Sequence, residues 1–169
     1  MIRVGKENFE YFRSDIRFTG KHARYIDALW KQNVIKDSYI RTLYELYGIA
    51  AILGLRIKST KPVDTSEGTR NLQSAQLAGY EPVLKTIMIT VLLLDETSGL
   101  TKEERINRAF RGPASKEELE ADMELLNSYV RGGIEYLYSE LVERTLTVED
   151  DYSDVRVGNL VALLEGRID

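Results

Sequence analysis

The sequence has no cysteine, a single histidine, three prolines and one tryptophan among its 169 residues. Without cysteine the chain cannot form disulfides, use a thiolate nucleophile or bind zinc through sulfur. With one histidine, the usual catalytic triads and the paired Glu-x-x-His motifs of a di-iron bundle lack their parts. These absences exclude the common catalytic and metal centres, and the sequence predicts no metal and no cofactor.

Long hydrophobic runs are also missing. The most apolar stretch, PVLKTIMITVLLLDE at 82–96, contains Lys85 and reaches Asp95 before it is long enough to span a membrane. The N-terminus, MIRVGKENFE, has neither the apolar core nor the cleavage site of a signal peptide. We therefore expect a cytoplasmic protein with no membrane partner.

The stretch at 82–96 is the centre of the predicted fold. Its β-branched residues are compatible with a buried strand, but its length and Pro82 at its start favour a helix. A helix that is apolar on most of its circumference has to be surrounded by other elements. The sequence thus predicts an all-α single domain over 1–169, with about six to eight helices packed around this one. Residues 1–18 are expected to form a short helix or an N-terminal arm.

Caps and hydrophobic periodicity place the other helices. They are expected at about 19–30, 38–58, 69–78, 101–110, 115–144 and 154–164, with an exposed loop at 59–68. Gly48 and Gly54 in the second of these helices are small enough to allow a close crossing by a neighbour. Gly132 and Gly133 in the longest helix predict either such a crossing or a kink.

The helix predicted at 115–144 has the clearest amphipathic pattern. Its apolar residues alternate spacings of four and three, which is typical of a helical bundle or a short coiled coil. The candidate interface residues are Leu119, Met123, Leu126, Val130, Leu137 and Leu141. They form either a contact with another chain or the core of this one, and for the pattern alone we expect the core.

Charge is unevenly distributed along the chain. Residues 1–70 hold 13 basic against 8 acidic residues, a charge of +5, and residues 71–169 hold 10 against 19, a charge of -9. This asymmetry fits a nucleic-acid-binding face, two protomers docking head to tail, or ordinary solvated surfaces. The candidate nucleic-acid-binding residues are Arg13, Arg17, Lys21, His22, Arg24 and Lys31, interleaved with Phe12, Phe18 and Tyr25.

Two positions are candidates for chemistry. His22 lies near a helix start, where free amides with Lys21 and Arg24 would bind an anion, but no glycine-rich phosphate loop precedes it. We favour a surface or half-buried histidine. Asp95 and Glu96 follow the apolar stretch, so one of them could be a desolvated general acid or a metal ligand. We favour a helix end that emerges into solvent.

Two phrases carry a resemblance. FTGKHARYI at 18–26 and LLLDETSGLTKEERINRAF at 92–110 resemble small uncharacterised bacterial helical proteins associated with DNA defence or mobile elements. Neither phrase is a catalytic signature, so the resemblance implies a context and assigns no role to a residue.

The absence of a catalytic constellation and the abundance of helix surface lead to one prediction. We expect a non-enzymatic helical interaction protein, acting as a homo-oligomer or as an accessory subunit of a larger bacterial assembly. Its partner is then a second copy or another protein. Two alternatives stay open: a nucleic-acid-binding accessory protein that uses the basic N-terminal half, and an enzyme with a carboxylate site near Asp95 and Glu96.

Overall fold

The computed structural model describes residues 9–30, 40–143 and 155–166, with the backbone alone for 155–159. Within these ranges it contains seven α-helices, one π-helix and a sheet of two strands. The predicted all-α fold of six to eight helices is confirmed. Every helix in the described ranges falls short of the length and apolarity that a membrane crossing requires.

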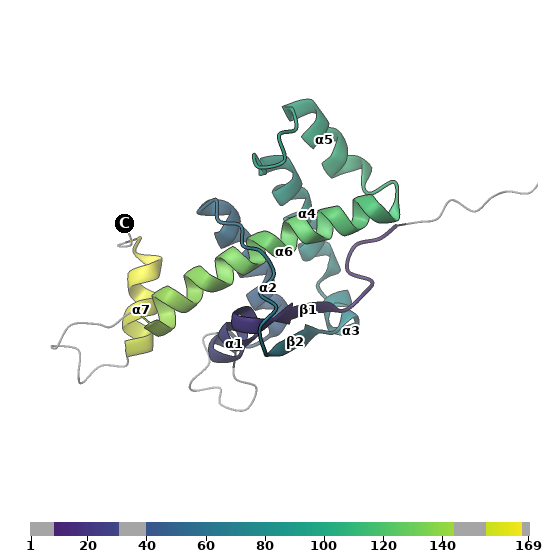
Figure 1. The fold of residues 1–169 in the computed structure, drawn as a ribbon. Helices are drawn as coiled ribbons and strands as arrows, with labels where there is room; N and C mark the ends of the chain where they lie inside the picture. The colour runs from purple at the N-terminus through teal and green to yellow at the C-terminus, as the bar shows by residue number, and fades with distance from the viewer. Residues whose placement is uncertain (1–8, 31–39, 144–154, 167–169) are drawn as a thin grey trace, which may run out of the picture.

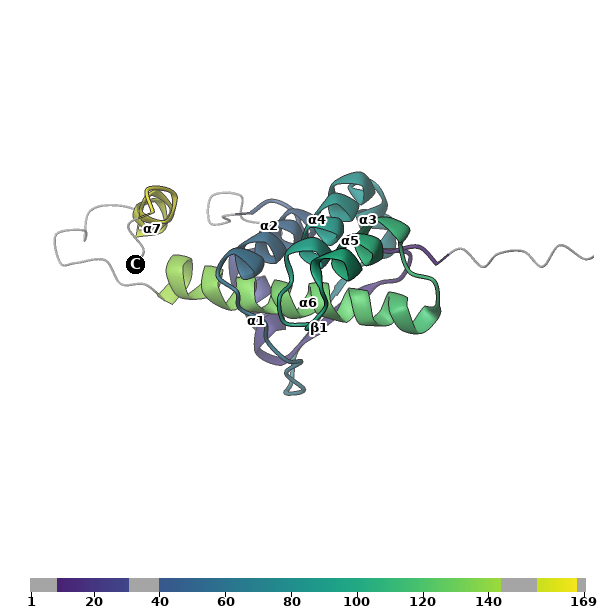
Figure 2. The ribbon, with the colours of Figure 1, turned by 90° about the horizontal axis from the view of Figure 1, so that it is seen from above.

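Figure 1 shows the order of the elements along the chain. They are β1 (Ile16–Thr19), α1 (Gly20–Leu29), α2 (Leu43–Arg56), β2 (Thr69–Leu72), α3 (Ser74–Ala78), α4 (Glu81–Leu94), α5 (Lys102–Arg111), α6 (Lys116–Tyr138), the π-helix η2 (Ser139–Glu143) and α7 (Val155–Leu164). The longest helix, α6, crosses the molecule, with α7 beyond its C-terminal end and α5 towards its N-terminal end (Figures 1 and 2).

The tightest helix contact is the crossing of α2 and α6. A Cβ atom added to Gly133 would lie 1.9 Å from the carbonyl oxygen of Ala50, and one added to Gly54 would lie 2.0 Å from that of Tyr129. Only glycine allows two helix backbones to approach so closely. The predicted close crossing is confirmed, and α6 continues as one helix through Gly132 and Gly133.

The apolar stretch at 82–96 forms helix α4, as predicted, and Pro82 lies in its first turn. It packs against α2, α5 and α6, and the residues that it buries are Leu84, Ile87, Met88, Val91 and Leu92. Its outer side is only partly covered, because Ile89 and Leu93 are half-buried while Val83 and Leu94 are exposed. α4 therefore contributes one face to the core rather than being enclosed on all sides.

The helix predicted over 69–78 is wrong for its first four residues. They form β2, which pairs antiparallel with β1 so that Ile16 lies opposite Leu72 and Thr19 lies opposite Thr69. Strands of four residues are too short for alternation to stand out against a helical pattern. Only 74–78, the short helix α3, is helical.

Residues 9–15 form an irregular arm whose aromatic side chains pack on the body, one of the two predicted alternatives; residues 1–8 lie outside the described ranges. The hydroxyl of Tyr11 donates to Oδ2 of Asp122 (2.5 Å), and Nε of Arg108 donates to Oδ1 of the same carboxylate (2.6 Å). This buried carboxylate therefore ties the arm and α5 to α6.

The helix predicted from residue 38 begins later, at Leu43. Oγ1 of Thr42 accepts a hydrogen bond from the amide of Glu45 (3.3 Å) and so caps α2. The start that we predicted for this helix, residue 38, lies outside the described ranges. At α5 the predicted capping box is present, because Thr101 and Glu104 each accept from the other's amide.

Candidate functional site: an apolar groove

The candidate interface residues of α6 and η2 belong mainly to the core of this chain. Leu126, Val130, Leu137 and Leu141 are buried, while Leu119 and Met123 are half-buried beside the N-terminal arm. The buried four are covered by this chain's own helices. For the spacing pattern of these apolar residues alone we expected the core of this chain, and the structure places most of them there.

The candidate nucleic-acid-binding residues do not share one free cationic face. Lys21 pairs with Glu135 through Nζ and Oε1 (2.8 Å). The other described members also have partners within the chain: Arg13 pairs with Glu10 and Glu81, Arg17 reaches the hydroxyl of Thr69, and Arg24 donates to the carbonyl of Glu67. Lys31 lies outside the described ranges. Of the three aromatic residues among these cations, Phe12 and Phe18 are buried, so their rings are not available to bases, and the half-buried ring of Tyr25 is stacked on Tyr138.

His22 is not a surface or half-buried residue, because it is only 1% exposed. Its Nε2 donates to Oε1 of Glu135 on α6 (2.9 Å), and Nζ of Lys61 lies 3.5 Å from Oε2 of the same carboxylate. Burial lowers the pKa of His22, against the opposing effect of the hydrogen bond to Glu135. The histidine is therefore neutral at pH 7, and among the described residues its buried Nδ1 has no hydrogen-bond partner.

The start of α1 is occupied by the chain's own carboxylate. Oδ2 of Asp64 accepts from the backbone amide of Lys21 (2.7 Å), and Ser66 donates to Asp64 through both its amide and its hydroxyl (3.0 Å each). These hydrogen bonds hold the pKa of Asp64 at about 2. Asp64 thus takes the position that a bound phosphate would take at this helix start.

Asp95 is buried rather than solvated, so the expectation of a helix end emerging into solvent is wrong for this residue and right for the exposed Glu96. Asp95 accepts from the hydroxyls of Tyr129 (2.6 Å) and Thr97 (2.7 Å) and from two backbone amides of the following turn. Burial raises the pKa of Asp95, but these hydrogen bonds together lower it below its ordinary value. A carboxylate held in its ionised form anchors the turn and is a poor general acid.

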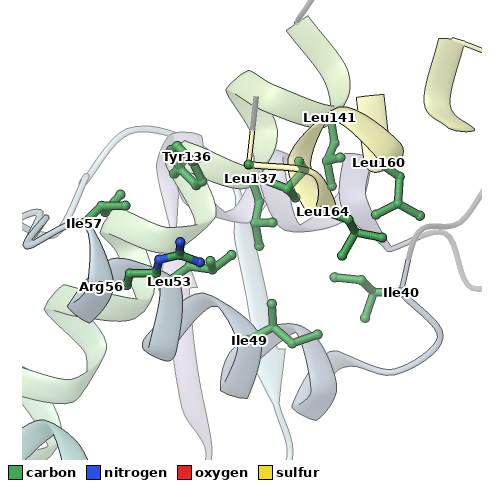
Figure 3. A pocket seen from close by; sticks show the side chains of 12 residues that line it. Ile40, Ile49, Leu53, Arg56, Ile57, Tyr136, Leu137, Leu141, Leu160 and Leu164 are labelled. Atoms are coloured by element: carbon green, nitrogen blue, oxygen red, sulfur yellow. The ribbon is translucent and has the colours of Figure 1, made fainter. Parts of the chain in front are cut away.

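Within the described ranges, no three histidine or carboxylate side chains come together as a metal-ligand set. A further candidate is an apolar groove of about 570 Å³ between α2, the α6–η2 junction and α7, a volume typical of binding sites. Figure 3 shows α2, α6, η2 and α7 each contributing side chains to it. Its lining residues are Ile40, Ile49, Leu53, Arg56, Ile57, Tyr136, Leu137, Leu141, Leu160, Leu163, Leu164 and Gly166.

Exposed apolar side chains gather around this groove. Of the 13 large hydrophobic residues that the structure describes as exposed, four line the groove: Ile49, Ile57, Leu160 and Leu164. Three more, Ile52, Val142 and Val161, lie on the helices that wall it. Single exposed apolar residues are ordinary, whereas a contiguous group around a hollow is typical of a binding surface. This concentration makes the groove the candidate functional site.

One end of the groove is polar. Arg56 and Tyr136 line it there, and Figure 3 shows the guanidinium of Arg56 lying near Tyr136 and Leu53. Within the described part of the chain neither the guanidinium of Arg56 nor the hydroxyl of Tyr136 has a hydrogen-bond or ion-pair partner. An apolar groove with an unpaired cation at one end suits an apolar occupant that also carries an anionic group.

The sequence contained a signal for this groove that periodicity alone did not resolve. α2 has apolar residues on two sides: one set, including Leu43, Tyr47 and Ala51, enters the core, and the other, including Ile49 and Ile52, stays exposed. When the apolar surface of a helix is wider than the face that packs on the core, the rest of that surface needs a second contact.

Comparison of the chain with models of protein families, with curated proteins and with solved structures gives no significant match.

Proposed function

We propose that the protein is a non-enzymatic helical interaction protein that self-associates through the apolar groove walled by α2, α6–η2 and α7. The observation that carries the proposal is the concentration of exposed apolar residues around the 570 Å³ groove. Burying such a surface against a second copy removes apolar area from water, at roughly 25 cal/mol per Å². The same surface would serve if the chain acted as an accessory subunit of a larger assembly.

The state of the buried carboxylates supports a role without catalysis. Asp122 accepts from Tyr11 and Arg108, and Asp95 accepts from Tyr129 and its own turn. A general acid or base has to exchange a proton with a substrate, whereas these groups are held by fixed donors in the interior. Neither of them lines the groove.

Sedimentation velocity at micromolar concentrations tests the proposal. We expect the wild-type chain to sediment as a dimer or larger species and Ile49→Glu to sediment as a monomer, because a carboxylate in the groove would be desolvated on association. The matched control is Val83→Glu, at an exposed helical position away from the groove (56% exposed, against 43% for Ile49), which should associate like the wild type. A wild-type chain that stays monomeric at every concentration would overturn the proposal, and so would undiminished association of Ile49→Glu.

A further inference from the structure

The outer side of α5 carries a stripe of exposed residues. Glu103, Ile106 and Phe110 are spaced three and four apart, so their side chains lie on one face of the helix. Phe110 is 69% exposed and Ile106 is 42% exposed, whereas Ala109 is buried. We refer to Glu103, Ile106 and Phe110 as the α5 stripe. An exposed aromatic ring beside an aliphatic side chain is typical of the anchor of a protein interface.

We propose that the α5 stripe of one copy docks in the groove of a second copy. Phe110 and Ile106 enter between the apolar walls, and Glu103 pairs with Arg56 of the second copy. This inference rests on the proposed function and names the occupant of the same groove.

The spacing of the two surfaces agrees. Glu103 and Phe110 are seven residues apart on α5, and Ile49 and Arg56 are seven residues apart on α2. At 1.5 Å per residue, each pair spans about 10.5 Å along its helix axis. With the two helices antiparallel, Glu103 therefore meets Arg56 while Phe110 meets Ile49.

The charges of the two surfaces are complementary. Glu103 is the charged residue of the α5 stripe, and Arg56 is the charged residue among the described residues that line the groove. Neither Arg56 nor Glu103 has an ion-pair partner within the described part of the chain, and pairing them across the interface gives each one. Complementary charge steers the encounter and fixes the direction in which α5 docks.

The two surfaces lie apart on the molecule, so the contact is head to tail. α5 lies towards the N-terminal end of α6, and the groove lies at its C-terminal end (Figures 1 and 2). Each copy then offers one stripe and one groove. Such a heterologous contact produces a ring when the rotation closes and an open chain when it does not.

Charge exchange tests the pairing of Glu103 with Arg56. By sedimentation, Arg56→Glu and Glu103→Arg should each weaken self-association about tenfold or more, because each places like charges opposite one another. The double variant Arg56→Glu/Glu103→Arg restores opposite charges and should recover most of the lost affinity. A double variant that is as weak as the two single changes combined would overturn the pairing.

Mixing two variants tests the head-to-tail geometry. Ile49→Glu disables the groove and keeps the stripe, while Phe110→Glu disables the stripe and keeps the groove. Each alone should be monomeric, and an equimolar mixture should form a one-to-one complex, because one intact stripe meets one intact groove. A contact between identical patches would show no such recovery, and this result would overturn the inference.

The outcome also separates this inference from the proposed function. Suppose that the wild type self-associates, that Ile49→Glu abolishes the association and that Phe110→Glu leaves it unchanged. The groove is then the interface, but its occupant is not the α5 stripe. If the wild type is monomeric, both proposals fail. Circular dichroism and the urea midpoint of each variant check that it is folded, and little change is expected because Phe110 and Ile49 are exposed.

Discussion

The two faces of α2 make opposite use of side-chain size. The face towards α6 carries the buried Ala50, Ala51 and Gly54, and there the helix backbones are in direct contact. The other face carries Ile49 and Ile57, which stay exposed beside the groove. Small residues leave no volume to fill, whereas large residues without a neighbour in the chain leave apolar surface in water. One helix thus supplies both the rigid centre of the fold and the candidate binding surface.

Stability should be most sensitive to substitution where α2 and α6 cross, and Gly133→Ala tests this. The new Cβ would lie 1.9 Å from the carbonyl oxygen of Ala50, so α2 and α6 have to separate. We expect a loss of about 1–3 kcal/mol or more in the free energy of unfolding, as for other overpacked cores. Urea denaturation followed by circular dichroism measures it.

Gly79→Ala is the matched control for that change. Gly79 has ordinary helical dihedral angles, and no atom lies within 4 Å of a Cβ built on it. Alanine there should leave stability unchanged or raise it by about 0.4–1 kcal/mol, because the unfolded chain loses freedom. Equal destabilisation by both substitutions would mean that close approach at Gly133 is not what matters.

The second largest effect on stability is expected at the turn after α4, which is held by the buried carboxylate of Asp95 rather than by apolar contacts. Asp95→Ala leaves the buried hydroxyl of Tyr129 without its acceptor, and we expect a loss of about 1–3 kcal/mol of stability. Tyr129→Phe removes the donor and should cost less, since the remaining donors still hold Asp95. Urea midpoints at pH 7 give both values, and a neutral Asp95→Ala would contradict the anchoring role.

Asp95 also predicts a pH dependence. Its pKa is lower in the folded chain than in the unfolded chain, so its contribution is complete above the ordinary value near 3.8 and disappears as the pH falls through the folded value. Wild-type stability should therefore decline below about pH 4. Asp95→Asn should decline less steeply over the same interval, and identical slopes would count against this assignment.

The positions of the helices followed from the sequence, but the assignment of their faces did not. The caps at Thr101 and Ser115 act through residues three positions away in the chain, so local patterns reveal them. The burial of His22 and Asp95 depends on Glu135 and Tyr129, which lie far away in sequence. No local pattern contains such a partner.

The candidate site was missed for a similar reason. The candidate interface residues of α6 are mainly core, as expected for their pattern alone, and the groove uses outward residues of α2, such as Ile49, that the sequence did not single out. Which of the two apolar faces of α2 is covered is decided by helices far away in sequence, in this case α6 and α4. The β1–β2 pairing was missed because 49 residues, 20–68, separate its two four-residue strands.

A third and smaller effect is expected at His22, where α1 meets α6. The groups facing its ring are Glu135, Lys21 and Arg131, and its pKa is lower in the folded chain than the ordinary value near 6.5. The unfolded chain therefore binds the proton more readily, and stability should fall as the pH falls below about 6.5. His22→Gln should lack this component, so the difference between its urea midpoint and that of the wild type should change between pH 7 and pH 5. A constant difference would contradict the assignment.

The smallest effect on stability is expected on the outer face of α2, and it tests the comparison most directly. Ile49→Ser removes an exposed apolar side chain and should change the free energy of unfolding by no more than about 0.5 kcal/mol. Its neighbour Ala50 faces α6 and is fully buried, so Ala50→Val should cost about 1–3 kcal/mol through overpacking. Sedimentation should reverse the order: Ile49→Ser weakens association, whereas the folded fraction of Ala50→Val keeps it. If Ile49→Ser instead destabilises the isolated chain as much as Ala50→Val does, the outer face of α2 belongs to the core. The groove is then not a binding surface.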